Sequence, residues 1–251
     1  MKIVYHKRYC EVYASDPAAA PGRIESIVKE LKGKFEFVTP QPANEEDLRL
    51  VHTQNHIEHV KRNAPLAFEI GLLAVGGAIK ASEIAMNKEP AFALIRPPGH
   101  HASPDSSWGF CYFNNVAIAI EKLRRNGKIE KAVIVDIDLH FGDGTANIFS
   151  GNPNVIYHHV ADNSREKFIN DLKIFLDSVK KCDIVAVSAG FDRHEMDWGG
   201  ILKTEDYRLA GKLVKEFAEK LCRGRRFAVL EGGYNHAVLG LNVKGFIEGF
   251  M

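Results

Sequence analysis

The chain has 251 residues, of which 45% are hydrophobic and 26% charged, and its formal net charge is +1 with neutral histidines. A domain of this length buries a large core without disulfide or metal staples, and the balanced charge argues against a nucleic-acid binder, an acidic partner or a charged membrane surface. The N-terminal segment is too charged for a signal peptide, and no apolar run approaches the roughly 20 residues of a membrane span, so we expect a soluble, cytoplasmic protein.

Short apolar runs alternate with longer amphipathic stretches along the chain. The runs are rich in β-branched residues, as expected of strands buried on both faces, whereas the stretches repeat apolar residues with helical spacing. In chain order we predict a short N-terminal strand, a helix over 24–31, a helix over 70–86, a strand over 91–95, a helix over 115–125, strands over 132–135 and 155–157, a helix over 168–179, a strand over 184–188, a helix over 209–221 with Thr204 as its N-cap, a strand over 227–230 and a helix over 236–250. This alternation predicts one α/β domain over residues 1–251, with a mainly parallel sheet and helices on both faces.

The cysteines give little sign of cross-links. All four lie far apart in the sequence and form no C-x-x-C pair: Cys10, Cys111, Cys182 and Cys222. We therefore expect buried reduced thiols rather than a disulfide framework or a structural zinc site.

Four of the predicted strands lead directly into polar segments marked by glycine. These segments are 96–102, 136–144, 189–194 and 231–234. In open α/β sheets, ligands bind beyond the carboxyl ends of the strands. We therefore expect the four segments to converge on one pocket.

The segment after 132–135 has the pattern of a metal site. Asp136, Asp138 and His140 alternate, so an extended backbone places them on one face, where a cation would balance the carboxylates. A catalytic zinc takes three protein ligands of this kind, and Asp192, after the strand 184–188, is the best third ligand. Two other interpretations stay open: a loop whose acidic groups bind backbone amides, with Asp192 as an N-cap, or ligation by His194, Glu195 or Asp197, which are further from the strand end.

The adjacent histidines His100 and His101 follow P-P-G, which restricts the backbone before them. Histidine titrates near neutrality, so the pair can supply a general base and a general acid, each oriented by a carboxylate. Asp136 and Asp143 are the carboxylates available near the metal loop. A structural or surface histidine pair is the alternative.

Two further segments carry candidate substrate-binding residues. Tyr234 follows Gly232 and Gly233 and could direct its hydroxyl at a carbonyl oxygen, although most tyrosines only fill space. Gly109 and Phe110 follow the histidine pair shortly afterwards and could wall an apolar tunnel. Core packing explains Phe110 equally well.

Together these segments resemble the histone deacetylase superfamily, which includes acetylpolyamine amidohydrolases and acetoin-utilisation proteins. The resemblance covers most of the chain and rests on five motifs in family order: R-P-P-G-H-H-A, G-F-C-Y-F-N-N, D-I-D-L-H-F-G-D-G, S-A-G-F-D and L-E-G-G-Y-N. It implies an arginase-like fold with a central, mainly parallel sheet of about eight strands.

The resemblance also implies a role for each matching residue. Asp138, His140 and Asp192 would ligate zinc. The other implied roles are an acid/base pair, His100 and His101, their orienting carboxylates, Asp136 and Asp143, a carbonyl-polarising tyrosine, Tyr234, a product-channel arginine, Arg23, and one of two aromatic residues around the substrate, Phe110.

The chain departs from the family pattern in its surface segments. It is shorter than most members, and after 155–157 it lacks the S-x-H segment and the glycine- and proline-rich loop that carries the second tunnel aromatic. The tunnel is therefore expected to be shallow, unless His158, His159 or a partner subunit completes it. The serine that helps to bind a structural potassium ion (K+) is replaced, which argues against that ion. No equivalent of the rim aspartate that holds a peptide backbone is evident.

These features predict a zinc-dependent deacetylase that hydrolyses acetylated lysine side chains or small acetylated amines. Ferrous iron (Fe2+) suits the same ligand set as Zn2+. One alternative is an arginase-like hydrolase with two manganese ions, which would use His194, Glu195 or Asp197 for the second ion. Another is a non-catalytic protein that binds acylated amines.

Overall fold

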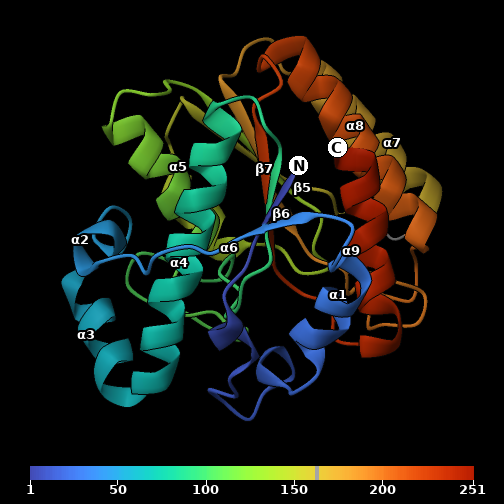
Figure 1. Ribbon diagram of the computed structural model, residues 1–251. Coiled ribbons are helices and arrows are strands. Elements are labelled where there is room, and N and C mark those ends of the chain that lie inside the picture. Colours follow the sequence, from blue (N-terminus) through green and yellow to red (C-terminus); the bar gives the residue numbers. More distant parts are fainter. Residues whose placement is uncertain (162–163) are drawn as a thin grey trace.

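A parallel sheet runs through the middle of the protein in the computed structural model, which describes residues 1–161 and 164–251 (Figure 1). Within these residues the strand order is β2-β1-β3-β7-β6-β4-β5, and every pairing is parallel. The strands are β1 (Lys2–Val4), β2 (Glu36–Val38), β3 (Ala91–Ala93), β4 (Ala132–Asp136), β5 (Val155–His159), β6 (Ile184–Ala189) and β7 (Arg226–Leu230). The predicted parallel α/β fold is confirmed, with seven strands in the described residues where about eight were expected.

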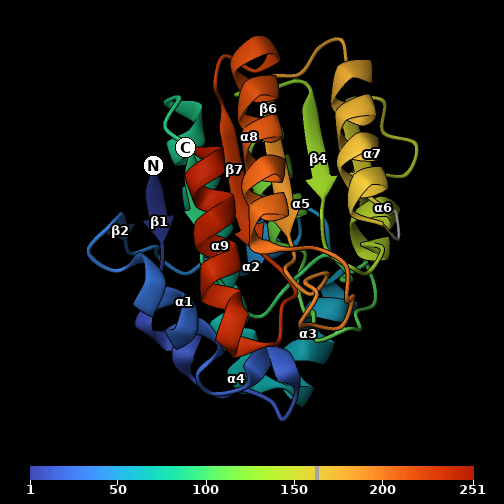
Figure 2. The ribbon, with the colours of Figure 1, turned by 90° about the vertical axis from the view of Figure 1, so that its right-hand side faces the viewer.

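Helices cover both faces of this sheet (Figures 1 and 2). The helices are α1 (Arg23–Leu31), α2 (Glu45–Leu48), α3 (Gln54–Asn63), α4 (Pro65–Met86), α5 (Asn115–Arg125), α6 (Asp143–Phe149), α7 (Arg165–Ser178), α8 (Thr204–Leu221) and α9 (His236–Phe250), with short 3-10 turns at Lys7–Cys10 and Pro17–Ala19. Helices α4 and α5 pack on one face, and α1, α7, α8 and α9 on the other. The departure from the family pattern after β5 includes Asp162 and Asn163, which lie outside the described residues.

The four central strands are buried along their whole length. Every residue of β3, β7, β6 and β4 is buried, which explains why their sequences are continuously apolar rather than alternating. Polar residues enter them mainly at the ends: Asp136 closes β4 and Arg226 opens β7. The side chains that follow these strands are therefore held by the most rigid part of the fold.

Helix α4 corrects one expectation from the sequence. It has 22 residues and is apolar enough, by length and composition alone, to cross a membrane. However, 72% of its most apolar window is buried inside the fold, where the helix packs on β1, β3 and β7. A buried core helix of a globular protein meets the same criterion. The length and composition of α4 are therefore weak evidence for a membrane span.

The start of α8 also differs from the prediction. Thr204 is the first residue of the helix and not its N-cap, and its hydroxyl donates to Asn242 Oδ1 of α9 at 2.6 Å. The cap position is taken by Lys203, whose backbone N–H donates to Asp206 Oδ2 at 2.7 Å. The carboxylate of Asp206, in the first turn of the helix, thus accepts a hydrogen bond from the backbone of the cap residue.

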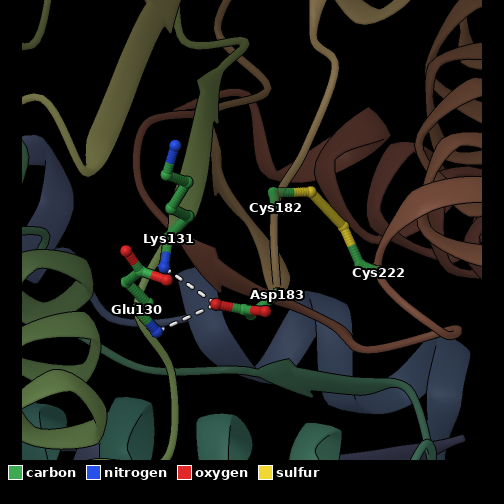
Figure 3. The surroundings of a disulfide bond; sticks show 5 residues. All are labelled: Glu130, Lys131, Cys182, Asp183 and Cys222. Carbon is green, nitrogen blue, oxygen red and sulfur yellow. Dashed lines mark hydrogen bonds between the residues drawn. A yellow bond between two sulfur atoms is a disulfide. The ribbon is translucent and has the colours of Figure 1, made fainter.

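The expectation of four reduced thiols is wrong for two of them. Cys182, just before β6, and Cys222, at the end of α8, form a disulfide (Figure 3). Their Cα atoms lie 5.6 Å apart, a normal separation for a disulfide, although 40 positions separate them in sequence. The next residue, Asp183, accepts hydrogen bonds from the backbone of Glu130 and Lys131 before β4 (Figure 3). Cys10 and Cys111 are free.

Candidate metal centre

The candidate site lies where four neighbouring strands end. In the sheet β3, β7, β6 and β4 are consecutive, and because all run parallel their carboxyl ends share one edge, at the bottom of Figure 2. The segments 96–102, 231–234, 189–194 and 136–144 leave from this edge in the same order. The structure therefore brings together the four polar segments that the sequence analysis singled out.

Three of these side chains form a cluster that fits a metal ion. Ligand atoms of Asp138, His140 and Asp192 all lie within 4.8 Å of one another. Both carboxylates are buried, while the side chain of His140 is 37% exposed. His140 Nδ1 lies 3.2 Å from Asp138 Oδ1 and 3.1 Å from Asp192 Oδ2. In the part of the chain that the structure describes, this is the one group of three or more such residues with this spacing.

Hydrogen bonds fix the carboxylates but leave one oxygen for a ligand. Asp138 accepts from the backbone N–H of Gly232 at 2.8 Å and of His140 at 2.9 Å, and Asp192 Oδ1 accepts from Leu139 N at 3.0 Å. Asp192 Oδ2 is buried and accepts no hydrogen bond of good geometry. A buried carboxylate oxygen without a donor is costly unless a cation lies next to it.

The charges of the cluster also call for a cation. The carboxylates of Asp138 and Asp192, next to Nδ1 of His140, raise the pKa of this imidazole to about 10. Burial raises the pKa of Asp192 to about 6, whereas at Asp138 burial is outweighed by His100 and His140, and the pKa falls. A divalent ion would balance both buried carboxylates, in place of a proton on His140.

Gly232 allows the loop after β7 to approach the cluster. A Cβ atom on Gly232 would lie 2.5 Å from Asp138 Oδ2 and 2.8 Å from Asp192 Oδ2, too close for any side chain. Gly233 adopts a φ of +117°, which favours glycine. Gly232 therefore permits the close approach to the metal cluster, and Gly233 permits the turn that follows.

His100 is tied to Asp136 at the end of β4. Its Nδ1 lies 3.0 Å from Asp136 Oδ2, and its Nε2 lies 3.8 Å from Asp138 Oδ1. Asp136 Oδ2 also accepts from the Tyr157 hydroxyl at 2.9 Å. Burial disfavours the charged imidazole, but the charges of Asp138 and Asp136 outweigh it and raise the pKa of His100.

His101 is tied to Asp143 at the start of α6. Its Nδ1 lies 2.6 Å from Asp143 Oδ1, and its ring centre lies 4.1 Å from that of His100. Trp108 lies against the ring of His101, with centroids 4.0 Å apart, and donates Nε1–H to Asp143 Oδ2 at 2.8 Å. Burial and the neighbouring His100 lower the pKa of His101. The pKa values of the two adjacent imidazoles are thus shifted in opposite directions.

Tyr234 packs between aromatic side chains of the loops beside the cluster. Its ring stacks on Trp198 with centroids 4.1 Å apart, and Phe110 meets it edge-on at 5.9 Å. Burial raises the pKa of Tyr234, so its hydroxyl keeps its proton. Phe110 has a φ of +67°, and a Cβ on Gly109 would collide with the His101 ring. This strained turn brings Phe110 close to the site.

Arg23 binds the backbone of the loop that carries Tyr234, residues 231–234. Its side chain is fully buried, and it donates to the main-chain oxygens of Gly233 at 2.8 Å and Glu231 at 2.5 Å. Its guanidinium lies 5.5 Å from the centre of the Tyr234 ring. The structure therefore gives Arg23 a direct contact with the tyrosine loop, while the implied role in a product channel stays a prediction.

The alternative ligands lie outside the cluster. Asp197 accepts from the backbone N–H groups of Trp198, Tyr234 and Asn235, each at 2.8 Å, and so joins the loop after β6 to the loop after β7. His194 accepts from Met196 N. In the described residues neither these two nor Glu195 joins the metal group, which leaves a second metal ion without support.

The two histidines at the end of β5, His158 and His159, contact residues away from the metal ligands' side chains. His158 stacks on Phe175 of α7 at 4.0 Å and bonds to Asp171. His159 Nε2 lies 2.9 Å from the main-chain oxygen of Asp138, behind the ligand loop. These contacts give no support to the suggestion that one of them forms the second wall, which stays a prediction.

Sequence reasoning missed several residues at the site. Glu231 accepts from the backbone N–H of Gly99 at 2.7 Å and of His100 at 3.2 Å, and burial raises its pKa to about 7. Trp108 and Trp198 were not considered, because exposed loop tryptophans follow no periodic pattern. Trp108 could have been found from its position two residues before Phe110.

Comparisons with known proteins find deacetylases among the relatives of this chain. A family model described as "Histone deacetylase domain" matches residues 18–169 and 162–250. A "Probable deacetylase" of Methanothermobacter thermautotrophicus is 30% identical over 91% of this chain and 84% of the relative, and one of Archaeoglobus fulgidus is 31% identical over 93% and 81%. A "Histone deacetylase-like amidohydrolase" of Pseudomonas aeruginosa is 27% identical over 88% and 75%.

A solved structure has the same fold. The crystal structure of the HDA15 HD domain superposes with a TM-score of 0.85 over 99% of this chain and 88% of that one, at 21% identity. The family model covers nearly the whole chain, and the two relatives named "Probable deacetylase" are 30% and 31% identical over more than nine-tenths of it. The chain therefore belongs to the histone deacetylase family.

Proposed function

We propose that the protein is a metal-dependent deacetylase that hydrolyses the amide bond of acetylated amines. The observation that carries this proposal is the placement of a three-residue metal cluster beside two histidines, each bound to a carboxylate of its own. Such an arrangement provides both a cation and proton-transfer groups at one point.

Asp138, His140 and Asp192 would hold the ion. Oxygen and imidazole ligands suit Zn2+, and Fe2+ accepts the same set. When bound, the ion would supply Lewis-acid chemistry, polarising the acyl carbonyl and lowering the pKa of water. The unsatisfied Oδ2 of Asp192 supports this assignment.

His100 and His101 would move the protons. Because Nδ1 of each ring is engaged by Asp136 or Asp143, Nε2 is the nitrogen that exchanges protons with water or with the leaving amine. The attacking water forms the new C–O bond and gives its proton to the pair. As the C–N bond breaks, the pair returns a proton to the departing amine, and acetate is the second product.

Tyr234 would stabilise the charge that develops on the acyl oxygen. Its hydroxyl keeps its proton. Its ring is held in place by the stack on Trp198 and by the contact with Arg23. A phenol aimed at a developing oxyanion is worth about 10²- to 10³-fold in rate. Asp197 supports this arrangement, since it joins the Trp198 and Tyr234 loops.

The exposed rim favours substrates that need little enclosure. Large apolar side chains around the cluster remain more than half exposed: Trp108, Phe141, Met196 and Trp198. Trp198 and Phe110 lie on two sides of Tyr234, with ring centres 6.4 Å apart. Such short aromatic walls suit an acetylated lysine side chain or a small acetylated amine.

An assay of acetate release tests the proposal. The purified protein, loaded with Zn2+ or Fe2+, is given acetyl-lysine peptides, acetylated polyamines and other small acetylated amines. We expect equal amounts of acetate and free amine, with about one metal ion per chain. His101→Ala should lose this activity while His59→Ala, an exposed histidine of α3, keeps it. Two bound ions per chain, or a metal-loaded protein inactive on every substrate, would contradict the proposal.

A further inference from the structure

The side chain of Arg193 lies behind the loop that carries two of the metal ligands. Arg193 directly follows Asp192 and is 2% exposed. Its Nε donates to the main-chain oxygen of Asp138 at 3.0 Å, and Nη2 donates to those of Leu139 at 3.4 Å and Val160 at 2.7 Å. One guanidinium thus joins the segments that follow β4, β5 and β6.

This guanidinium is sealed from solvent. Its central carbon lies 5.4 Å from the centre of the Phe168 ring in α7, which is fully buried. Nη2 also lies 3.2 Å from His159 Nε2, which in turn is 2.9 Å from the main-chain oxygen of Asp138. A buried cation is stable only when it is surrounded by such acceptors, and the planar fork of arginine reaches several of them at once.

The contacts of Arg193 bear directly on the ligand geometry. The carboxylate of Asp138 belongs to the metal cluster, while its main-chain oxygen belongs to Arg193. The backbone N–H of Leu139 donates to Asp192, and its oxygen accepts from Arg193. The side chain of Arg193 therefore holds the Asp138–Leu139 segment, and its backbone continues directly from Asp192. The backbone oxygen of Arg193 accepts from Leu202 at 2.8 Å.

We propose that Arg193 is a positioning residue whose guanidinium acts as a built-in cation for the metal site. The guanidinium binds main-chain oxygens of the loop that carries Asp138 and His140, as a bound monovalent ion would. Unlike such an ion, it is part of the protein chain. The inference rests on the proposed metal site and not on the proposed reaction. It implies that zinc binding by the wild-type protein is independent of the monovalent cation in solution.

The test measures zinc affinity, by competition with a chromogenic chelator, for the full-length wild type, Arg193→Met and Arg193→Lys. Each is measured in potassium, sodium and tetramethylammonium chloride, and with millimolar guanidinium added. We expect Arg193→Met to bind Zn2+ about 10- to 100-fold more weakly, as for other residues that orient metal ligands. Guanidinium or potassium should restore part of this affinity, and the bulky tetramethylammonium ion should not. Arg193→Lys, which keeps the charge but has fewer donors, should bind with intermediate affinity.

Arg226 provides a matched control. It is also a buried arginine, and it donates to main-chain oxygens of Phe250, Gly224 and Met251, but it lies at the opposite end of β7 from the site. Arg226→Met should lower the stability of the protein and leave zinc affinity unchanged. A purely structural role for Arg193 would give the same result as this control, with no rescue by added cations.

Three outcomes would overturn the inference. The first is a folded Arg193→Met with wild-type zinc affinity, and the second is weaker binding that no cation restores. The third needs no variant: wild-type zinc affinity that depends on potassium would show that the guanidinium does not replace a soluble ion. Zinc binding is measured without turnover, so a protein that binds zinc but hydrolyses nothing would contradict the proposed function alone.

Discussion

Among single residues, Gly232 shows most directly how the site constrains the sequence. Its N–H donates to Asp138, and its α-carbon lies so close to the cluster that a Cβ would come within 3 Å of carboxylate oxygens of both Asp138 and Asp192. A Cβ atom does not approach a carboxylate oxygen this closely, so a substitution must push the loop away. The same movement would displace Tyr234, two positions further on.

Gly232→Ala is therefore expected to weaken metal binding. Loss of the N–H contact and displacement of Asp138 should reduce zinc affinity by about 10-fold or more, the usual effect of disturbing the partners of a ligand. Chelator competition measures the change. Gly33→Ala is the control, because Gly33 has a φ of +80° but open space around it, so the substitution strains the backbone without touching the site. Equal zinc affinity in Gly232→Ala and the wild type would contradict the steric argument.

Tyr234→Phe separates catalysis from binding. The substitution removes one hydroxyl and keeps the ring that stacks on Trp198, so kcat should fall by about 10²- to 10³-fold with little change in KM or in zinc affinity. Steady-state kinetics on the best substrate measure this. Tyr5 follows β1 directly, and Tyr5→Phe, which removes a hydroxyl that lies 3.4 Å from Cys10 Sγ, should leave kcat unchanged. Unaltered kcat in Tyr234→Phe would exclude the phenol from the reaction.

At the scale of elements, His52 connects the helices beside the site to its loops. It lies between α2 and α3, with Nδ1 2.9 Å from the main-chain oxygen of Ser103, and its Nε2 accepts from Asn114 N at 2.9 Å. Accepting at Nε2 requires a neutral ring. Burial, followed by the charge of His56, lowers the pKa of His52 to about 3. Through these two hydrogen bonds, His52 holds Ser103 and Asn114, which lie before and after Phe110 in the chain.

The lowered pKa predicts a loss of stability in acid. The unfolded chain takes up the proton at a pKa of about 6.5, so the stability held above that pH falls by up to about 1.4 kcal/mol per pH unit until about pH 3. Urea unfolding at about pH 7 and about pH 5 should therefore show a smaller stability loss in His52→Gln, which has no ring to protonate, than in the wild type. His59→Gln on the exposed side of α3 should behave like the wild type. Equal losses in His52→Gln and the wild type would mean that His52 does not titrate this way.

Which elements could be predicted from sequence follows from their environment. β4, β6 and β7 are buried on both faces and read as continuous apolar runs, and α8 has a clear apolar stripe. In contrast, β2 is a three-residue edge strand, Glu36–Val38, with exposed and half-buried residues, and α6 contains Gly144 and only seven residues. Neither has a periodic pattern, so neither was predicted.

The same distinction applies to the candidate site. Residues at strand ends, such as Asp138 and Asp192, could be placed from sequence because the sheet fixes their positions. Trp198 and Arg193 could not, because their contacts depend on how long loops fold back over the sheet. Proximity of Cys182 and Cys222 likewise depends on the packing of α8 against the sheet, which no local pattern reports.

At the scale of the whole molecule, the metal cluster and the disulfide lie at opposite ends of the strands. The metal cluster lies beyond the carboxyl ends of the strands, whereas the disulfide joins the residue two positions before β6 to the end of α8. The six residues of β6 span about 20 Å between these regions. A change at the disulfide is therefore expected to alter the stability of the fold without altering the site.

Replacing both Cys182 and Cys222 by serine tests this separation. Opening a cross-link across 40 residues should lower the free energy of unfolding by up to about 4 kcal/mol, because the unfolded chain gains freedom, while zinc affinity stays at the wild-type value. Urea unfolding and chelator competition measure the two effects, and Cys10→Ser, at a free cysteine, is the control. Protein alkylated before cell lysis should retain two unmodified cysteines that become reactive only after reduction. Alkylation of all four cysteines before reduction would show that the bond does not form in the cell.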